Sequence, residues 1–187
     1  MEGKTVVISA PSGAGKTSIV NFLLSKIPSL NFSVSACSRE KRLDEINGKD
    51  YYFLNISEFK SKIDKGDFLE WEEVYPDQYY GTLNSELERI WSENKHVVFD
   101  IDVAGGINVK NKFTSNCISI FIMPPSLTVL EKRLSDRRSE SLSSISKRIK
   151  KSEEEISKNQ YFDYVVLNDD FTIACNEVLA LVANFLK

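Results

Sequence analysis

The fold is decided by the stretch Thr5-Val6-Val7-Ile8-Ser9-Ala10-Pro11-Ser12-Gly13-Ala14-Gly15-Lys16-Thr17. Its first part contains a short apolar run that is typical of a buried strand, and a glycine-rich turn follows. The next residues have apolar side chains at the spacing of one helix face, namely Ile19, Val20, Leu23, Leu24 and Ile27. This order of strand, loop and helix predicts the first unit of an α/β fold.

The loop of residues 10–17, called the phosphate loop below, has the residue types that hold a phosphate. It matches the pattern G-x-x-x-x-G-K-[ST], with Ala10 in place of the first glycine. Gly13 and Gly15 let backbone N–H groups converge on one phosphate, and the helix N-terminus adds partial positive charge. We expect Lys16 to reach the β- and γ-phosphates and Thr17 to offer its hydroxyl to Mg²⁺. The alternative is an ordinary turn rich in small residues, which the Gly-Lys-Thr ending opposes.

The rest of the chain predicts a parallel sheet with an inserted lobe. Continuous apolar runs at 97–101, 117–122 and 164–167 are typical of strands buried on both faces, so we expect helices on both sides of the sheet. Between 33 and 82 the segments are short, aromatic and polar, which indicates a small mixed lobe with antiparallel strands. Its strands are expected near 50–53, 68–71 and 78–81, with an acidic loop between Trp71 and Tyr79. Helices are expected at about 57–65, 126–134, 142–156 and 173–186.

Composition excludes several classes of protein. The chain has 187 residues, of which 42% are hydrophobic, and a net charge of -3, which does not indicate a nucleic-acid binder. No apolar run approaches the roughly 20 residues that span a bilayer. The N-terminus lacks a signal-peptide pattern, and Gly3 is not at the position of a myristoylated glycine. We therefore expect a cytoplasmic protein without membrane or nucleic-acid partners, and its oligomeric state stays open.

Cysteine and histidine usage argues against two kinds of site. Cys37, Cys117 and Cys175 have no paired spacing and are expected to be reduced packing residues. His96 is the only histidine, so a zinc site and a Ser-His-Asp triad are both disfavoured.

Charge is distributed unevenly along the chain. Residues 33–90 have 8 basic and 13 acidic side chains, whereas residues 131–151 have 8 basic and 3 acidic ones. A basic stretch of this kind is ordinarily a solvated helix face, unless a negative partner lies opposite it.

Several short motifs, in their order and spacing, resemble the guanylate kinase family over nearly the whole chain. Besides the phosphate loop they are Ser33-Val34-Ser35, Arg39, Arg42, Asn47-Gly48-Lys49-Asp50-Tyr51, Phe68-Leu69-Glu70-Trp71, Tyr79-Tyr80-Gly81-Thr82, Asp100-Ile101-Asp102, Arg133-Leu134, Arg137, Arg148 and Asn168-Asp169. The resemblance implies one domain over 1–187 with a P-loop NTPase-type core. Its implied parts are a core at about 1–32, 83–125 and 160–187, a GMP-binding lobe at 33–82 and a helical lid at 126–159.

The resemblance also implies a GMP site. The residues that would hold the GMP phosphate are Ser35, Arg39, Arg42, Tyr51 and Tyr80. Guanidinium groups match a phosphate dianion with two hydrogen bonds each. Glu70, Thr82 and Asp102 would select the base, because an ionised carboxylate accepts from both guanine N1–H and the amino group. A hydroxyl of Thr82 or Ser35 could donate to guanine O6.

On the ATP side, the resemblance implies contacts along the loop and the lid. The implied ATP-binding residues are Ala10, Pro11, Ser12, Gly13, Ala14, Gly15, Lys16, Thr17, Ser18, Arg133 and Asn168, the last near the adenine. Arg137 and Arg148 would meet the transferring phosphoryl group and act in catalysis with Lys16 and Arg39. Mg²⁺ would be held by Thr17 and, through water, by Asp100. Arg138 stands where the family usually has glycine.

The implied reaction is MgATP + GMP ⇌ ADP + GDP, in purine nucleotide metabolism. One alternative is a monophosphate kinase for another base, which Glu70 and Asp102 oppose. The other is an inactive, protein-binding module of guanylate kinase type, which the intact Gly15-Lys16-Thr17 opposes.

Overall fold

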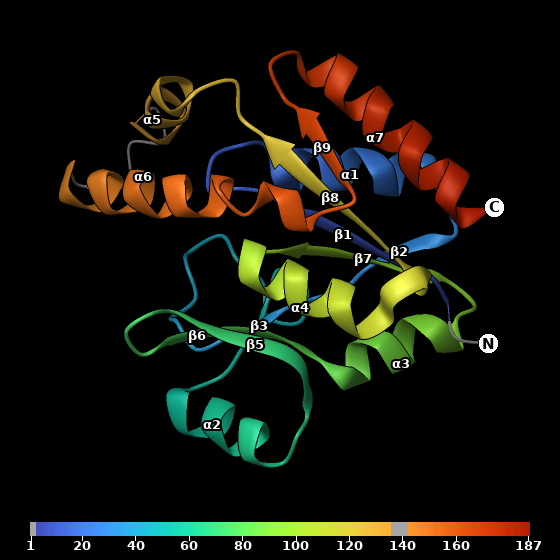
Figure 1. Cartoon of the computed structure of the whole chain (residues 1–187). Helices are drawn as coiled ribbons and strands as arrows, with labels where there is room; N and C mark the ends of the chain where they lie inside the picture. Colours follow the sequence, from blue (N-terminus) through green and yellow to red (C-terminus); the bar gives the residue numbers. More distant parts are fainter. Residues whose placement is uncertain (1–2, 136–141) are drawn as a thin grey trace.

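A five-stranded parallel sheet forms the centre of the molecule (Figure 1). The computed structural model describes residues 3–135 and 142–187. The strands of this sheet are β1 (Thr5–Ser9), β2 (Leu30–Phe32), β7 (His96–Ile101), β8 (Cys117–Met123) and β9 (Tyr164–Leu167), in the order β2-β7-β1-β8-β9. All neighbouring pairs are parallel, which confirms the predicted sheet. The three-residue β2 was not predicted.

Helices cover both faces of this sheet (Figure 1). They are α1 (Lys16–Lys26) and α7 (Phe171–Leu186) on one face, and α3 (Asn84–Ser92) and α4 (Val103–Phe113) on the other. Successive side chains of a strand point to opposite faces, so Val6 and Ile8 pack with the α1 and α7 side, while Val7 packs with the α3 and α4 side. The apolar runs are continuous because both faces are buried.

A second sheet of four strands lies below the first in Figure 1. Its strands are β3 (Ala36–Cys37), β4 (Tyr52–Phe53), β5 (Phe68–Tyr75) and β6 (Gln78–Leu83), in the order β4-β3-β6-β5. Only β3 and β4 pair in parallel, which confirms the predicted mixed sheet. Helix α2 (Ile56–Asp64) packs on it through Phe59, whose ring stacks on Phe68 at 4.4 Å between centroids.

The expected acidic loop between Trp71 and Tyr79 is instead a strand and a tight turn. Strand β5 continues to Tyr75, which pairs with Gln78. Asp77 takes a positive φ of 60° in the turn and donates its N–H to Glu73 Oε1 at 2.8 Å. The acidic side chains of this segment are therefore held on a strand.

Two further helices, α5 (Leu127–Ser135) and α6 (Leu142–Ile156), pack together beside the end of β8 (Figure 1). The short 3-10 helices η1 (Thr114–Asn116) and η2 (Asn159–Tyr161) complete the chain. Arg137 and Arg138 lie outside the described residues. All three cysteines are buried and free, as expected.

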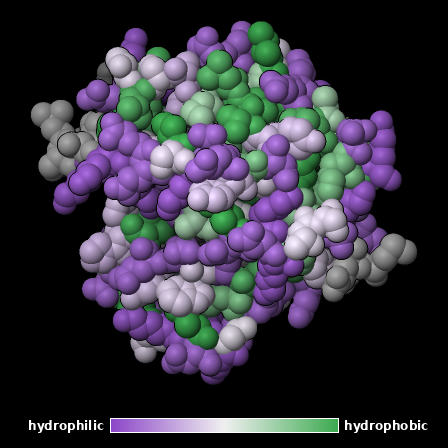
Figure 2. Space-filling view, in the orientation of Figure 1, coloured by the Kyte–Doolittle hydropathy of each residue, from purple (hydrophilic) through white to green (hydrophobic). Residues whose placement is uncertain are grey.

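Most of the face shown in Figure 2 is hydrophilic, with larger hydrophobic areas in its upper half. Large hydrophobic side chains of β9 and the start of α7 are exposed, among them Val165, Leu167 and Ile173. Within the described part of the chain, no helix is both long and apolar enough to cross a membrane.

Candidate active site

The phosphate loop joins β1 to α1 and depends on two glycines. Gly13 and Gly15 have φ values of +90° and +95°, a region that favours glycine. A Cβ on Gly15 would also lie 2.4 Å from Asn168 Nδ2. Ala10 is buried and has no positive φ, which explains why alanine fits there.

The last two side chains of the loop, Lys16 and Thr17, contact an aspartate of the neighbouring strand. Parallel pairing of β1 and β7 sets Ile8 beside Asp100. The Asp100 carboxylate accepts from Lys16 Nζ and, at 2.6 Å, from Thr17 Oγ1. The predicted phosphate and Mg²⁺ residues are therefore brought together at the end of the sheet.

Two adjoining cavities, of about 400 Å³ and about 180 Å³, open beside the loop. Both are lined by Lys16, Tyr51, Tyr80, Asp100 and Asp102. The larger one adds residues of the phosphate loop, Ser18, Arg39, Arg42 and, from α6, Arg148, Lys151 and Glu155. The smaller one adds Ser35, Glu70 and Glu72. A space of this size suits a small polar ligand.

Arg39 and two tyrosines form one wall of the larger cavity. The Arg39 guanidinium lies 5.0 Å from the Tyr51 ring centroid and donates to Glu45 through two nitrogens, at 2.5 and 2.7 Å. These bonds lower the pKa of Glu45 to about 2. Burial raises the pKa of Tyr51 and of Tyr80, so both hydroxyls stay protonated and can donate. Arg42 is exposed at the rim.

Sequence reasoning missed Glu45, which holds the Arg39 guanidinium in place with two hydrogen bonds. Its Oε2 also accepts the backbone N–H of Arg42 at 2.9 Å. An acidic residue three positions after Arg42 was the available signal.

The smaller cavity ends at a buried carboxylate. Glu70 is 8% exposed, and burial raises its pKa to about 7, with Asp102 and Glu72 adding to the effect. Thr82 donates its hydroxyl to Glu70 Oε1 at 2.7 Å and is fully buried. This hydroxyl therefore orients Glu70, and a donation from Thr82 to guanine O6 stays a prediction. Ser35 keeps its place in the lining.

Asp102 has a structural partner as well as a place at both cavities. It is the N-cap of α4, and its Oδ1 accepts the N–H of Gly105 at 2.8 Å. This bond fixes the Asp102 carboxylate near Glu70. The two carboxylates lie so close to Gly105 that a Cβ there would contact both.

Helix α6 and the residue that follows β9 both contact the phosphate loop. Arg148 of α6 donates to Ser12 Oγ. Asn168 is 4% exposed and donates from Nδ2 to the Ala14 carbonyl at 2.7 Å, while Arg133 donates to the Asn168 carbonyl at 3.3 Å. Asn168 thus stabilises the phosphate loop through the Ala14 carbonyl. A contact of Asn168 with adenine stays a prediction. Arg137 lies outside the described residues.

Comparison with known proteins agrees with this geometry. The family model described as guanylate kinase matches residues 2–184. The chain belongs to the guanylate kinase family. It is 47% identical to a guanylate kinase of Salinibacter ruber, over 97% of this chain and 96% of the relative. It is 43% identical to one of Porphyromonas gingivalis, over 98% of each chain. A crystal structure of guanylate kinase from Anaplasma phagocytophilum superposes with a TM-score of 0.79 at 29% identity, over 99% of this chain and 87% of that one.

Proposed function

We propose that this chain is an ATP:GMP phosphotransferase, which forms ADP and GDP and serves purine nucleotide metabolism. The observation that carries the proposal is the pair of adjoining cavities, with the phosphate loop at one end and buried Glu70 at the other. The arginines and tyrosines between them suit a phosphate that must sit beside the γ-phosphate of ATP.

The chemistry needs little beyond positioning. The attacking atom is an oxygen of the GMP phosphate, which is already anionic, so no general base is required. Lys16 and Arg148 lie on the ATP side of the larger cavity, and Arg39 lies on the GMP side. These cations, joined by Arg137 in our proposal, stabilise the charge on the transferring phosphoryl oxygens.

Magnesium fits the residues beside the loop. Thr17 Oγ1 and the Asp100 carboxylate are hard oxygen donors held 2.6 Å apart. Mg²⁺ usually takes few protein ligands and keeps several waters, so a hydroxyl and a water-bridged carboxylate suffice alongside ATP. When bound, the ion neutralises charge on the β- and γ-phosphates.

We assign residues 33–82 as the GMP-binding lobe and 126–159 as the lid, which close over both nucleotides and exclude water. Without such closure ATP would be hydrolysed. A cytoplasmic location stays a prediction from the sequence.

The test measures ADP formation from MgATP with GMP, AMP, UMP or CMP. Because Glu70 suits guanine's paired donors, kcat/KM for GMP should exceed that for AMP by about 10⁴. Lys16→Ala should fold but lose most of kcat. Comparable rates with AMP would contradict base selection, and a wild-type chain without turnover would favour the protein-binding module.

A further inference from the structure

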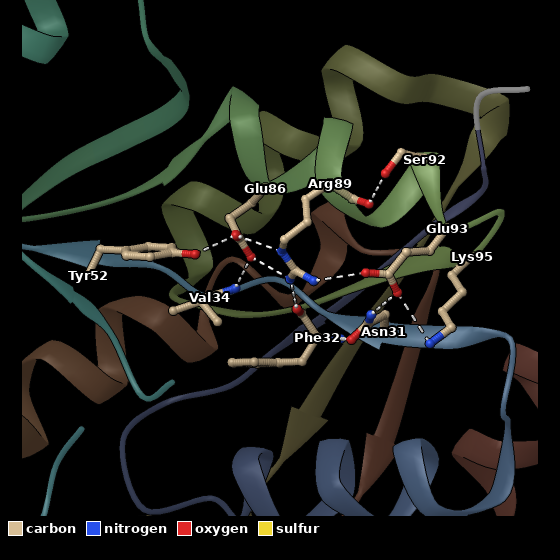
Figure 3. Close-up of polar contacts among 9 residues, drawn as sticks. All are labelled: Asn31, Phe32, Val34, Tyr52, Glu86, Arg89, Ser92, Glu93 and Lys95. Carbon is tan, nitrogen blue, oxygen red and sulfur yellow. Dashed lines mark hydrogen bonds and ion pairs between the residues drawn. The ribbon is translucent and has the colours of Figure 1, made fainter. Parts of the chain in front are cut away.

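Glu86 of α3 is a buried carboxylate whose partners come from three parts of the chain (Figure 3). It is 2% exposed. Its Oε1 accepts from Tyr52 Oη at 2.8 Å and from Arg89 Nε at 3.0 Å. Its Oε2 accepts from the Val34 N–H at 2.9 Å and from Arg89 Nη2 at 2.8 Å. All four contacts come from hydrogen-bond donors, so each carboxylate oxygen accepts two hydrogen bonds.

The partners of Glu86 neighbour residues of the proposed GMP site. Val34 precedes Ser35, and Tyr52 follows Tyr51. The two segments are also joined to each other, because the Tyr52 N–H donates to the Ser35 carbonyl at 2.9 Å. Glu86 therefore bonds to the residue next to each of two side chains that line the smaller cavity, through the Val34 N–H and the Tyr52 hydroxyl.

Glu86 also lies where the chain passes between the two sheets. The chain leaves the central sheet after β2 and returns from β6 directly into α3. Arg89 donates to the carbonyl of Phe32, the last residue of β2, at 3.2 Å (Figure 3). Glu86 and Arg89 of α3 thus contact the segment that leaves the central sheet after β2 and also contact β4.

The charge of Glu86 is maintained by these contacts. Burial alone would raise its pKa, but hydrogen bonds from Arg89, the Val34 N–H and Tyr52 outweigh burial and lower it. A buried carboxylate with this many donors is costly to alter, because each donor would lose its partner.

We propose that Glu86 is a positioning residue of the GMP site: it holds Val34 and Tyr52 so that Ser35 and Tyr51 face the GMP phosphate. The proposal rests on the proposed function, since it presumes that GMP is the substrate. It concerns GMP alone, because none of the partners of Glu86 belongs to the phosphate loop.

The test compares Glu86→Gln with Glu93→Gln. An amide has one oxygen, so its NH2 group must face donors that Glu86 now accepts. Glu93 directly follows α3 as its C-cap, contacts Arg89 at 3.7 Å and Asn31 at 3.1 Å, and is 43% exposed, but it touches no residue of the smaller sheet in the described contacts. For Glu86→Gln, KM for GMP should rise about tenfold, with kcat and KM for ATP within about twofold of wild type. Glu93→Gln should match wild type.

Equal KM values for GMP in the two variants would overturn the proposal, as would a parallel loss toward both substrates that follows the fraction of unfolded protein. If Glu86→Gln fails to fold, Tyr52→Phe removes one donor and leaves the carboxylate paired. It should raise KM for GMP severalfold while the protein stays folded at the assay temperature, and an unchanged KM would overturn the proposal. Failure of the wild type to phosphorylate GMP would instead count against the proposed function.

Discussion

Glu70 connects the burial of a single side chain to the choice of base. Its pKa of about 7 means that the free carboxyl is only partly ionised at neutral pH. The ionised form accepts from guanine, whereas the protonated form has an O–H that would face guanine's donors. GMP binding should therefore release a proton near neutral pH and weaken as the pH falls.

The first prediction at this scale is a pH profile. Below about pH 7, kcat/KM for GMP should fall up to about tenfold per pH unit, because only ionised Glu70 binds guanine. The GMP phosphate itself has a second ionisation near pH ~6, so the profile is taken as the ratio of wild type to Glu70→Gln. Glu155 of α6 also has a pKa raised to about 7 by burial, and Glu155→Gln separates its contribution. A pH-independent ratio would show that Glu70 does not titrate in binding.

Residue roles were predictable where a local motif carries them. The phosphate loop and Asp100 could be assigned because loop chemistry and one adjoining strand define them. Glu45 was missed although its partners Arg39 and Arg42 are close in the sequence. Glu86 could not be assigned, since its role depends on partners that only folding brings close. Glu86 and the Val34 N–H, for example, are 52 residues apart in the chain.

At the scale of elements, helix α6 allows a test of the proposed lid, because its Arg148 is among the described residues. Arg148 reaches Ser12 of the phosphate loop from this helix. Arg148→Ala should lower kcat by about 10² or more, with KM for GMP unchanged, because arginines at a transferring phosphoryl group act in the transition state. Arg148→Lys should recover only part, since an ammonium lacks the planar fork. Lys150→Ala, an exposed neighbour, is the matched control. Wild-type turnover in Arg148→Ala would remove Arg148 from the mechanism.

Most elements with a strong repeating pattern were predicted, whereas helices α3 and α4 and the short strands β2 and β3 were missed. Strands β1, β7, β8 and β9 are continuous apolar runs, and α6 has the predicted bounds 142–156. Strands β2 and β3 contain only three and two residues, too few for a pattern. Helix α4 contains Gly105-Gly106, which weakens its helical signal. Gly106 is needed because a Cβ there would lie 2.4 Å from Ser9 Oγ.

At the scale of the whole molecule, the basic stretch of the sequence lies opposite acidic residues of the smaller sheet. Helix α6, part of the proposed lid, faces the phosphate loop through Arg148 and the acidic strand β5 through Lys151, whose Nζ lies 5.2 Å from the Tyr75 ring centroid. Burial and Asp102 raise the pKa of Glu72, while Lys158 and Lys151 act in the opposite direction. Helix α6 is thus attracted to the smaller sheet through Lys151 and contacts the phosphate loop through Arg148.

This attraction predicts a salt-dependent closure. Lys151→Gln should lower kcat about threefold at low salt, because a partly exposed cation over a ring contributes about 0.5–1 kcal/mol. Raising the ionic strength from about 0.05 M to about 0.5 M shortens the Debye length and should slow the wild type more than Lys151→Gln. The difference between the two salt slopes gives the contribution of the Lys151 charge, which lines the larger cavity and also faces Tyr75 of β5. Lys150→Gln should keep the wild-type slope. Identical slopes in all three proteins would mean that the lid closes through the nucleotide alone.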